Sequence, residues 1–224
     1  MVSIDTVYQK VLALANKEQR GYITPQEFNL FADQAQRDIF EQYFYDLNQL
    51  LRVPSNSDEY ADIVDNLREK IAIFENQGTI TGAVINAPNG LYRLGTLSFE
   101  GVEIEEVQQN EILYINNSYL TRPTEKRPVY VRTGELGVNI FPNTITNAEC
   151  SYIARPTRPS WGYVVVQGKA MYDPTNRVDF QLHASEEGDL VNKILMYAGV
   201  SMKATDVAQA AGGLQMAKEQ QEKQ

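Results

Sequence analysis

The sequence contains very few of the side chains on which most catalytic and metal sites depend. Its 224 residues include a single cysteine, Cys150, and a single histidine, His183. One cysteine cannot form a disulfide within the chain, and its presence fits a reducing compartment. An imidazole base for a nucleophile would have to be His183, which directly precedes a position typical of a helix cap. This scarcity argues against most nucleophilic and metal-assisted enzymes.

Long hydrophobic runs are also missing. No uninterrupted apolar run approaches the roughly 20 residues that a membrane-spanning helix needs. The N-terminal segment MVSIDTVYQK lacks the apolar core of a signal peptide. The net charge of −9 argues against broad binding to phosphate backbones and to anionic membranes. We therefore expect a soluble protein that is made inside the cell and binds no membrane.

Motifs of the common catalytic and cofactor sites are absent from the sequence as well. It contains no GxSxG, HExxH or CxxC motif, and the glycines at 212–213 lack the spacing and the Lys-Ser/Thr of a P-loop. Carboxylates cluster at Glu103, Glu105 and Glu106, but acidic runs of this kind are usually solvated faces. We predict that the protein is not an enzyme and uses no cofactor or metal ion, with a carboxylate-based hydrolase as an alternative.

Helical periodicity is abundant, above all in residues 22–51. Thr24 is followed by a proline and, three positions later, by Glu27, which is the pattern of a capping box. Ile23 and Phe28 stand where a hydrophobic staple would form. Apolar residues then share one face, which further aromatic residues widen: Ala32, Ala35, Ile39, Tyr43, Leu47 and Leu50, with Phe31, Phe40, Phe44 and Leu51. The pattern predicts one long helix that is buried on more than one side.

Further segments share this periodicity: residues 4–19, 58–76, 185–199 and 203–223. The short join between the first of them and the long helix predicts a helical hairpin. Gly78 and Gly199 would each follow or close a helix. The last segment has a thin apolar stripe that includes Leu214 and then becomes polar. We expect it to order only on docking to a neighbour.

Residues 79–182 have a different composition, rich in β-branched and aromatic residues and interrupted by Gly, Pro and Asn. The candidate strands are ITGAVI, LYRLGTLSF, RPVYVRT, GVNIF, AECSYIA, YVVVQG and VDFQL. The segment QQNEILYIN is a candidate short helix. Turns between paired strands are expected at residues 135–137 and 173–176.

This segregation of helices and strands predicts the α+β class. We expect an N-terminal helical hairpin with a third helix, a central mixed or antiparallel β region, and C-terminal helices. The predicted parts are residues 1–78, 79–183 and 184–224. The first and the last of these are expected to pack together as one helical domain.

Residues 16–27 have the length of a calcium-binding loop between two helices. Gly21 and Glu27 occupy the positions of the glycine and the bidentate glutamate of an EF-hand loop. A ligand position is taken by Arg20, however, which places a cation where the metal should lie. The capping box accounts for Glu27 without a metal ion. We therefore predict an ordinary helical hairpin that does not bind calcium.

The segment SYIARPTRPSWGYVVVQG holds the only tryptophan of the chain. Its two prolines favour an extended backbone with few hydrogen bonds, so the segment should cross a surface. Tryptophan and arginine are enriched in interface hot spots. The candidate interface residues are Arg155, Arg158, Trp161, Tyr163 and, near the C-terminus, Leu214. A competing interpretation is that Trp161 covers the β core from outside.

The order of these elements resembles that of structural proteins of tailed bacteriophages, especially marine and crAss-like podoviruses. NKEQRGYITPQEFNLFADQAQRDIFEQYF is similar to their N-terminal segment. SYIARPTRPSWGY, FQLHASEEGDLVNKILMYAGV and the Gln/Lys/Glu-rich tail extend the likeness over most of the chain. Within that group the chain resembles a head-to-tail connector, adaptor or neck ring protein of the tail tubular protein A type.

This resemblance implies a structural virion protein of the neck or tail that is made in the host cytoplasm and has no catalytic residues. It implies a homo-oligomeric ring, twelve-fold and beneath the portal, that contacts the portal protein and other neck or tail ring proteins. DNA would pass through without sequence-specific binding, and a net acidic chain suits this because it repels phosphate. A ligand- or carbohydrate-binding β module of a phage particle, with Trp161 in a cleft, stays open as an alternative.

Overall fold

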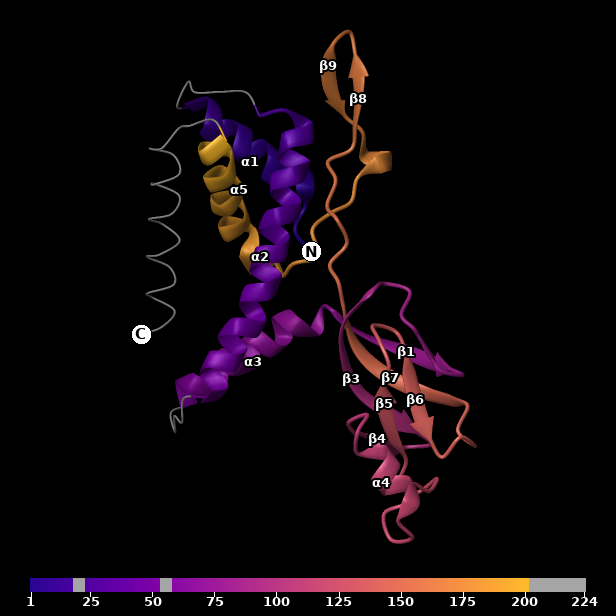
Figure 1. The fold of residues 1–224 in the computed structure, drawn as a ribbon. Coiled ribbons are helices and arrows are strands. Elements are labelled where there is room, and N and C mark those ends of the chain that lie inside the picture. Colours follow the sequence, from indigo (N-terminus) through magenta and orange to yellow (C-terminus); the bar gives the residue numbers. More distant parts are fainter. Residues whose placement is uncertain (18–22, 53–57, 202–224) are drawn as a thin grey trace. The chain divides into compact units, whose positions relative to one another are not determined.

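The computed structural model describes residues 1–17, 23–52 and 58–201 (Figure 1). The chain divides into two compact units. The helical unit comprises Met1–Ile73 and the chain from Pro156 onward, and the sheet unit comprises Phe74–Arg155. The predicted α+β class is confirmed, with helices at the N-terminus, a central sheet and a further helix after it.

The unit boundaries differ from the predicted ones at residues 78 and 183. The first strand of the sheet unit begins at Glu75, so the change from helix to strand comes earlier than expected. Residues 156–183 cluster with the helices and not with the sheet. The Gln36 side chain, on a helix of the helical unit, donates to the Thr157 carbonyl and accepts from the Gln181 amide. These two bonds explain the assignment, because they hold both ends of the segment against that helix.

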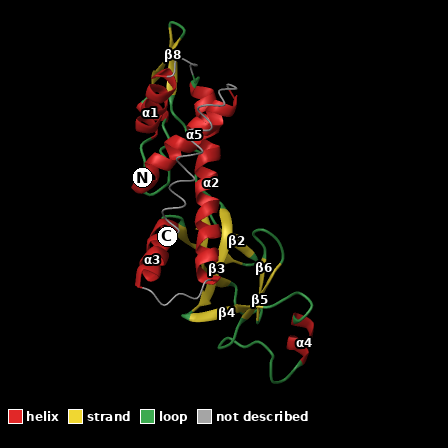
Figure 2. Ribbon diagram, turned by 90° about the vertical axis from the view of Figure 1, so that its left-hand side faces the viewer, coloured by secondary structure: helices red, strands yellow, loops and turns green. Residues whose placement is uncertain are grey.

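The helical unit contains four of the described α-helices: α1 (Ile4–Lys17), α2 (Pro25–Arg52), α3 (Asp58–Ala72) and α5 (Glu187–Ser201). Helix α5 packs against both α1 and α2, and α3 packs against α2 (Figure 2). The buried side chains come from the faces that the periodicity predicts, among them Val7, Phe28, Ile39, Leu190 and Ile194. The predicted last helix, at 203–223, lies outside the described residues.

Helix α2 begins with the capping box that its sequence predicts. The Glu27 amide donates to the Thr24 hydroxyl over 3.3 Å, and the Thr24 amide donates to the Glu27 carboxylate over 3.0 Å. The Thr24 hydroxyl also donates to the Glu27 carboxylate over 2.7 Å, and this bond, followed by that from the Thr24 amide, lowers the pKa of Glu27. Ile23 and Phe28, the predicted staple pair, are both buried. The other positions of the calcium-like loop fall largely on residues 18–22, which lie outside the described part of the chain.

Replacing Thr24 by alanine should lower the free energy of unfolding by about 1 kcal/mol, because the amide of Glu27 loses its acceptor. Thr24→Ser keeps the hydroxyl and serves as the matched control, with a change close to zero. Urea unfolding followed by circular dichroism measures both. Equal losses in the two variants would show that the hydroxyl is not what stabilises this end of the helix.

An ion pair between a half-buried lysine and a buried glutamate joins α3 to the start of α5. Glu186 ends a short 3-10 helix, η2 (Ala184–Glu186), and its carboxylate lies 2.7 Å from the Lys70 ammonium. The same ammonium lies 5.7 Å from the centre of the Tyr43 ring of α2. Burial, followed by the nearby Glu186 charge, raises the pKa of Tyr43. Three helices therefore meet around one ion pair.

The end of α3 differs from the prediction. The periodicity placed it at residue 76 with Gly78 as the stop, but the helix ends at Ala72 and β1 (Glu75–Thr81) follows. Gly78 lies inside β1 opposite Cys150, where an added Cβ would come within 2.7 Å of the Asn86 carbonyl oxygen. A glycine is needed there for close approach of strands. Gly199, the other predicted stop, lies within α5.

The sheet unit is built on one sheet of seven strands in the order β2-β1-β7-β3-β4-β5-β6. The remaining strands are β2 (Val84–Asn86), β3 (Leu91–Phe99), β4 (Val102–Glu106), β5 (Val129–Arg132), β6 (Val138–Phe141) and β7 (Asn147–Ala154). Only β4 and β5 pair in parallel, so the sheet is mixed, as predicted. Helix α4 (Ile112–Asn117), the predicted short helix, lies between these two strands in the chain.

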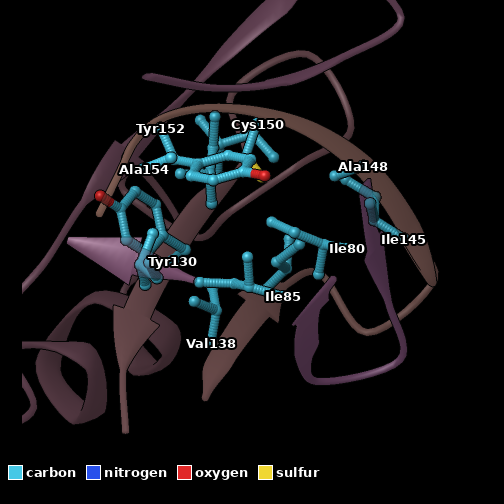
Figure 3. Close-up of a cluster of buried hydrophobic side chains, with 13 residues drawn as sticks. Ile80, Ile85, Tyr130, Val138, Ile145, Ala148, Cys150, Tyr152 and Ala154 are labelled. Carbon is cyan, nitrogen blue, oxygen red and sulfur yellow. The ribbon is translucent and has the colours of Figure 1, made fainter. Parts of the chain in front are cut away.

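The sheet curls until its outermost strands meet. The Val138 amide donates to the Ala83 carbonyl over 3.0 Å, and the Ile85 amide donates to the Leu136 carbonyl over 2.9 Å. The enclosed core contains Leu97 and Ile104 in addition to Ile80, Ile85, Val138, Cys150 and Tyr152. Figure 3 shows the side chains of the last five converging inside the curve. The two chain ends of the unit also meet, since the Ala154 amide donates to the Phe74 carbonyl over 2.8 Å.

Some predicted strands have a different structure. The run ITGAVI contains a turn, because β1 ends at residue 81 and β2 begins at residue 84. VDFQL forms no strand and makes only isolated bridges, Val178 with Ser160 and Phe180 with Val2. Residues 173–176 do not turn between paired strands but form a 3-10 helix, η1 (Pro174–Asn176). The strands β4 and β9 were not predicted.

Candidate assembly surface

A separate two-stranded sheet is the most distinctive feature of the helical unit. Strands β8 (Tyr163–Val166) and β9 (Lys169–Tyr172) pair with each other and with no other strand of the described chain. The two residues between them, Gln167 and Gly168, have φ of 50° and 76°. Positive φ at both positions is the geometry of a tight type I′ turn. In Figures 1 and 2 the hairpin extends beyond the ends of α1 and α2.

The hairpin exposes apolar side chains on both of its faces. The exposed fractions are 51% for Val164, 62% for Val165, 47% for Val166 and 57% for Met171. Successive residues of a strand point to opposite faces, so three exposed valines in a row leave neither face covered. A hairpin of two strands is only marginally stable alone in water. Its apolar faces are therefore suited to a contact outside its own chain.

Trp161 anchors the base of this hairpin to the helices. Its indole is only 4% exposed, and its ring centre lies 6.0 Å from that of Tyr163 and 5.5 Å from that of Tyr172. One ring thus contacts the first residue of β8 and the last residue of β9. The indole N–H donates to the Asp5 carboxylate of α1 over 2.9 Å, which satisfies the only polar group of the side chain.

The anchor continues into α2. The Trp161 amide donates to the Asn29 side-chain carbonyl over 2.7 Å, and the Asn29 side-chain amide donates back to the Trp161 carbonyl over 3.4 Å. Tyr8 of α1 lies between aromatic neighbours, with its ring centre 4.3 Å from that of Trp161 and 4.7 Å from that of Phe28. At Gly162 an added Cβ would come within 2.6 Å of the Asp173 carbonyl oxygen. The base of the hairpin is therefore fixed by both helices.

The charges near the hairpin lie at its base. Hydrogen bonds from the Thr175 amide and the Asn176 side chain lower the pKa of Asp173, and these bonds hold the turn that follows β9. The Tyr172 hydroxyl, followed by the Asp179 charge, raises the pKa of Arg177. The two strands and their turn carry one formal charge, that of Lys169. The hairpin itself is thus almost neutral.

The five predicted interface residues are not brought together. Trp161 is buried within its own chain, and Tyr163 is half-buried against it. Arg158 is exposed and 3.9 Å from the Asp33 carboxylate of α2. Arg155 belongs to the sheet unit, where it pairs with Glu135 over 2.9 Å. Leu214 lies outside the described residues.

The predicted interface residues include Tyr163 at the start of the hairpin but none of its exposed valines. Sequence analysis selected Trp161 on residue type, whereas the exposed apolar residues are the valines that follow. Burial of Trp161 also changes the competing interpretation, because the ring covers helices α1 and α2 and not the β core. The signal for the exposed part was the run VVV followed directly by Gln-Gly. Consecutive valines next to a two-residue turn are apolar on both faces of a hairpin.

The sheet unit has an exposed apolar region and a cavity of its own. Around α4, the side chains of Leu113, Tyr114, Tyr119 and Leu120 are exposed. A cavity of about 700 Å³ is lined by aliphatic residues as well as by polar, charged and aromatic ones, among them Leu97, Glu103, Tyr119, Arg122 and Tyr130. Burial, followed by the charge of Glu106, raises the pKa of Tyr130 to about 12. Trp161, which the ligand-binding alternative placed in a cleft, belongs to the other unit.

Cys150 and His183, the two side chains considered for nucleophilic catalysis, both take part in the packing or capping of the fold. The Cys150 thiol is buried in the sheet core, where burial raises its pKa. The His183 ring accepts a hydrogen bond from the Ser185 amide and so caps η2, two residues before the serine at which the predicted helical segment begins. Within residues 1–17, 23–52 and 58–201, no group of three or more potential ligands could hold a metal ion.

The helices of the described chain are too short or too polar to cross a membrane. No protein-family model matches the sequence. A search of the curated proteins likewise gives no significant match.

Proposed function

We propose that the protein is a structural subunit of a ring in the head-to-tail connector of a tailed bacteriophage. In this role it joins the portal to the tail and surrounds the DNA channel in the neck of the virion. The observation that carries the proposal is the β8–β9 hairpin, which is anchored by Trp161 and exposes apolar side chains on both faces. Such a hairpin suits a subunit that completes its packing on a neighbour.

The resemblance of the N-terminal segment to podovirus structural proteins supports the same role. It specifies the phage particle, which the hairpin alone does not. The described helices are compatible with a ring subunit, since α2 leaves Leu30, Tyr45 and Leu51 exposed in addition to its buried face. The portal protein and other neck ring proteins are the partners that this role requires. The acidic chain, with a net charge of −9, suits a channel that does not retain DNA.

The purified chain should assemble into a closed ring, alone or on purified portal protein. Closed point-group symmetry is the usual state of homo-oligomers. Native mass spectrometry with and without portal protein gives the subunit number, and electron microscopy of the virion locates the ring. A chain that stays monomeric under both conditions, together with virions that lack it, would contradict the proposal.

A ligand-binding role of the sheet unit is the second candidate. It is favoured by the cavity of about 700 Å³, which is within the usual size range of small-molecule sites. Tyr119 offers an aromatic face, and Glu103 and Arg122 offer hydrogen-bonding groups suited to a saccharide. Titration calorimetry with neutral and acidic oligosaccharides tests this role, with Tyr119→Ala as the comparison. If no heat of binding is measured, or if the heat is the same with Tyr119→Ala, the result counts against a ligand-binding role.

A further inference from the structure

Both outer edges of the β8–β9 hairpin have backbone groups directed away from the hairpin. The Asp173 amide donates to the Gly162 carbonyl over 2.8 Å, so residues 162 and 173 form a hydrogen-bonded pair. Hydrogen-bonded and non-bonded pairs alternate along an antiparallel ladder. Three positions further along the register, Val165 and Ala170 face each other as a non-bonded pair. Their N–H and C=O groups therefore point outward, one set on each edge.

The two edges are complementary to each other in a second copy of the chain. Strand β8 runs opposite to β9, so rotating a copy about an axis brings its β9 alongside β8 of its neighbour in antiparallel orientation. This contact uses different surfaces on the two copies, and such contacts generate rings when the rotation closes. Each subunit has one edge of each kind, which leaves no strand edge unpaired in the closed assembly.

We propose that hairpins of neighbouring subunits pair edge to edge, β8 of one copy with β9 of the next, and form one continuous antiparallel sheet around the ring. This inference rests on the proposed function, since it specifies the contact that the ring would use. It assigns the outward backbone groups of Val165 and Ala170 as the hydrogen-bonding partners between subunits. The valines of β8 then pack against residues of the adjacent hairpin.

Charge and residue type favour a second copy as the occupant of these edges. The whole chain carries a net charge of −9, whereas the hairpin carries only Lys169. At the hairpin, two acidic chains can therefore approach with little repulsion. Valine has high β-propensity and packs well on cross-strand neighbours. Ala170 leaves room beside its edge, because its side chain is small.

The anchored base lowers the cost of this pairing. Strand addition to a disordered hairpin would require ordering of both strands at the moment of binding. Here Trp161 contacts Tyr163 and Tyr172, so both strands are held in place before a neighbour arrives. The tight turn at Gln167 and Gly168 fixes the other end. The hairpin thus presents pre-ordered edges.

Proline substitutions test each edge separately. Val165→Pro removes the outward N–H of β8, and Ala170→Pro removes that of β9, while neither removes a hydrogen bond within the hairpin. Each should raise the subunit concentration for half-assembly at least about tenfold, because about two hydrogen bonds are weakened or lost at every subunit contact. Val165→Thr and Ala170→Ser keep the N–H and are the matched controls. Native mass spectrometry and size-exclusion chromatography give the assembly state.

Mixing the two proline variants distinguishes unlike-edge pairing from like-edge pairing. A Val165→Pro subunit keeps an intact β9 edge, and an Ala170→Pro subunit keeps an intact β8 edge. Their equimolar mixture should contain heterodimers joined by one native contact, but no rings. Pairing of like edges predicts instead that one variant assembles normally by itself. That result would overturn the proposal.

Two measurements keep the test independent of hairpin folding. Trp161 is the only tryptophan, so an unchanged emission spectrum shows that the base of the hairpin is intact in each variant. In otherwise unchanged chains, a short bismaleimide should cross-link Val165→Cys subunits to Ala170→Cys subunits, and neither variant to itself. The wild-type chain, with only the buried Cys150, is the control. Absence of the mixed cross-link in an assembled ring would overturn the proposal.

The outcomes separate this inference from the proposed function. If the wild-type chain and both proline variants form rings equally well, edge pairing is wrong and the ring function is unaffected. If the wild-type chain is monomeric with and without portal protein, both are wrong. Loss of rings in both proline variants, with rings retained in the threonine and serine controls, supports edge pairing.

Discussion

Replacing Trp161 by alanine should lower the free energy of unfolding of the helical unit by about 3–5 kcal/mol, the usual cost of removing a buried tryptophan. The side chain contacts Tyr8, Tyr163 and Tyr172, so its removal leaves a cavity among three rings. It also leaves the Asp5 carboxylate without the indole donor. Urea unfolding followed by far-ultraviolet circular dichroism is the appropriate measurement, because the variant has no tryptophan emission.

Trp161→Phe is the matched variant for this experiment. It keeps an aromatic ring among the three tyrosines but loses the N–H that donates to Asp5. A smaller loss of about 1–2 kcal/mol is expected, because the deleted bond has a charged acceptor and is only partly buried. If alanine costs less than about 1 kcal/mol, the indole is not part of the folding core. The original interpretation of Trp161 as an interface residue would then be favoured.

Replacing Gln36 by leucine should lower the free energy of unfolding by about 2–4 kcal/mol, because it leaves two backbone groups without partners. The Gln36 side chain is fully buried. It donates to the Thr157 carbonyl over 2.8 Å and accepts from the Gln181 amide over 3.0 Å. These two residues flank the hairpin segment on either side. One glutamine of α2 therefore holds both chain segments that lead to and from the hairpin.

Gln34→Leu is the control for this change, since it makes the same replacement at an exposed position two residues earlier on α2. Its effect on stability should stay within about 0.5 kcal/mol. Hydrogen exchange adds a local measurement, because the Gln181 amide should exchange faster in Gln36→Leu than in Gln34→Leu. Equal free energies of unfolding of the two leucine variants would show that the buried hydrogen bonds of Gln36 make no net contribution to stability.

Helices were predictable where their signals are local. The cap at Thr24 and the apolar spacing after Phe28 place the start of α2 within a few residues of Pro25. The short helix α4 was found from two isoleucines three positions apart. Capping and periodicity act within one or two turns, so a single sequence contains the information needed.

The strands, and the exposure of individual side chains, were less predictable because they depend on partners far away in the chain. Phe74 and Ile71 continue the helical spacing of α3, but strand β1 starts at Glu75 because β7 supplies a partner some 70 residues later. Val178 and Phe180 alternate as a strand would, yet they find only single bridges. For the candidate site, composition identified the segment around Trp161. The run VVV before Gln-Gly is a local signal for the exposed residues, but the burial of Trp161 depends on contacts with α1 and α2, which are far away in the chain.

The meeting of the two ends of the sheet unit makes this unit a self-contained insertion. The chain leaves the helical unit after Ile73 and returns at Pro156, and next to these points Glu75 pairs with Ile153 in adjacent strands. An inserted module with neighbouring ends can be lengthened, exchanged or replaced by a short linker without rerouting its host. Natural variation in this protein can therefore act on the sheet unit as a cassette, while the helices and the hairpin keep their own packing.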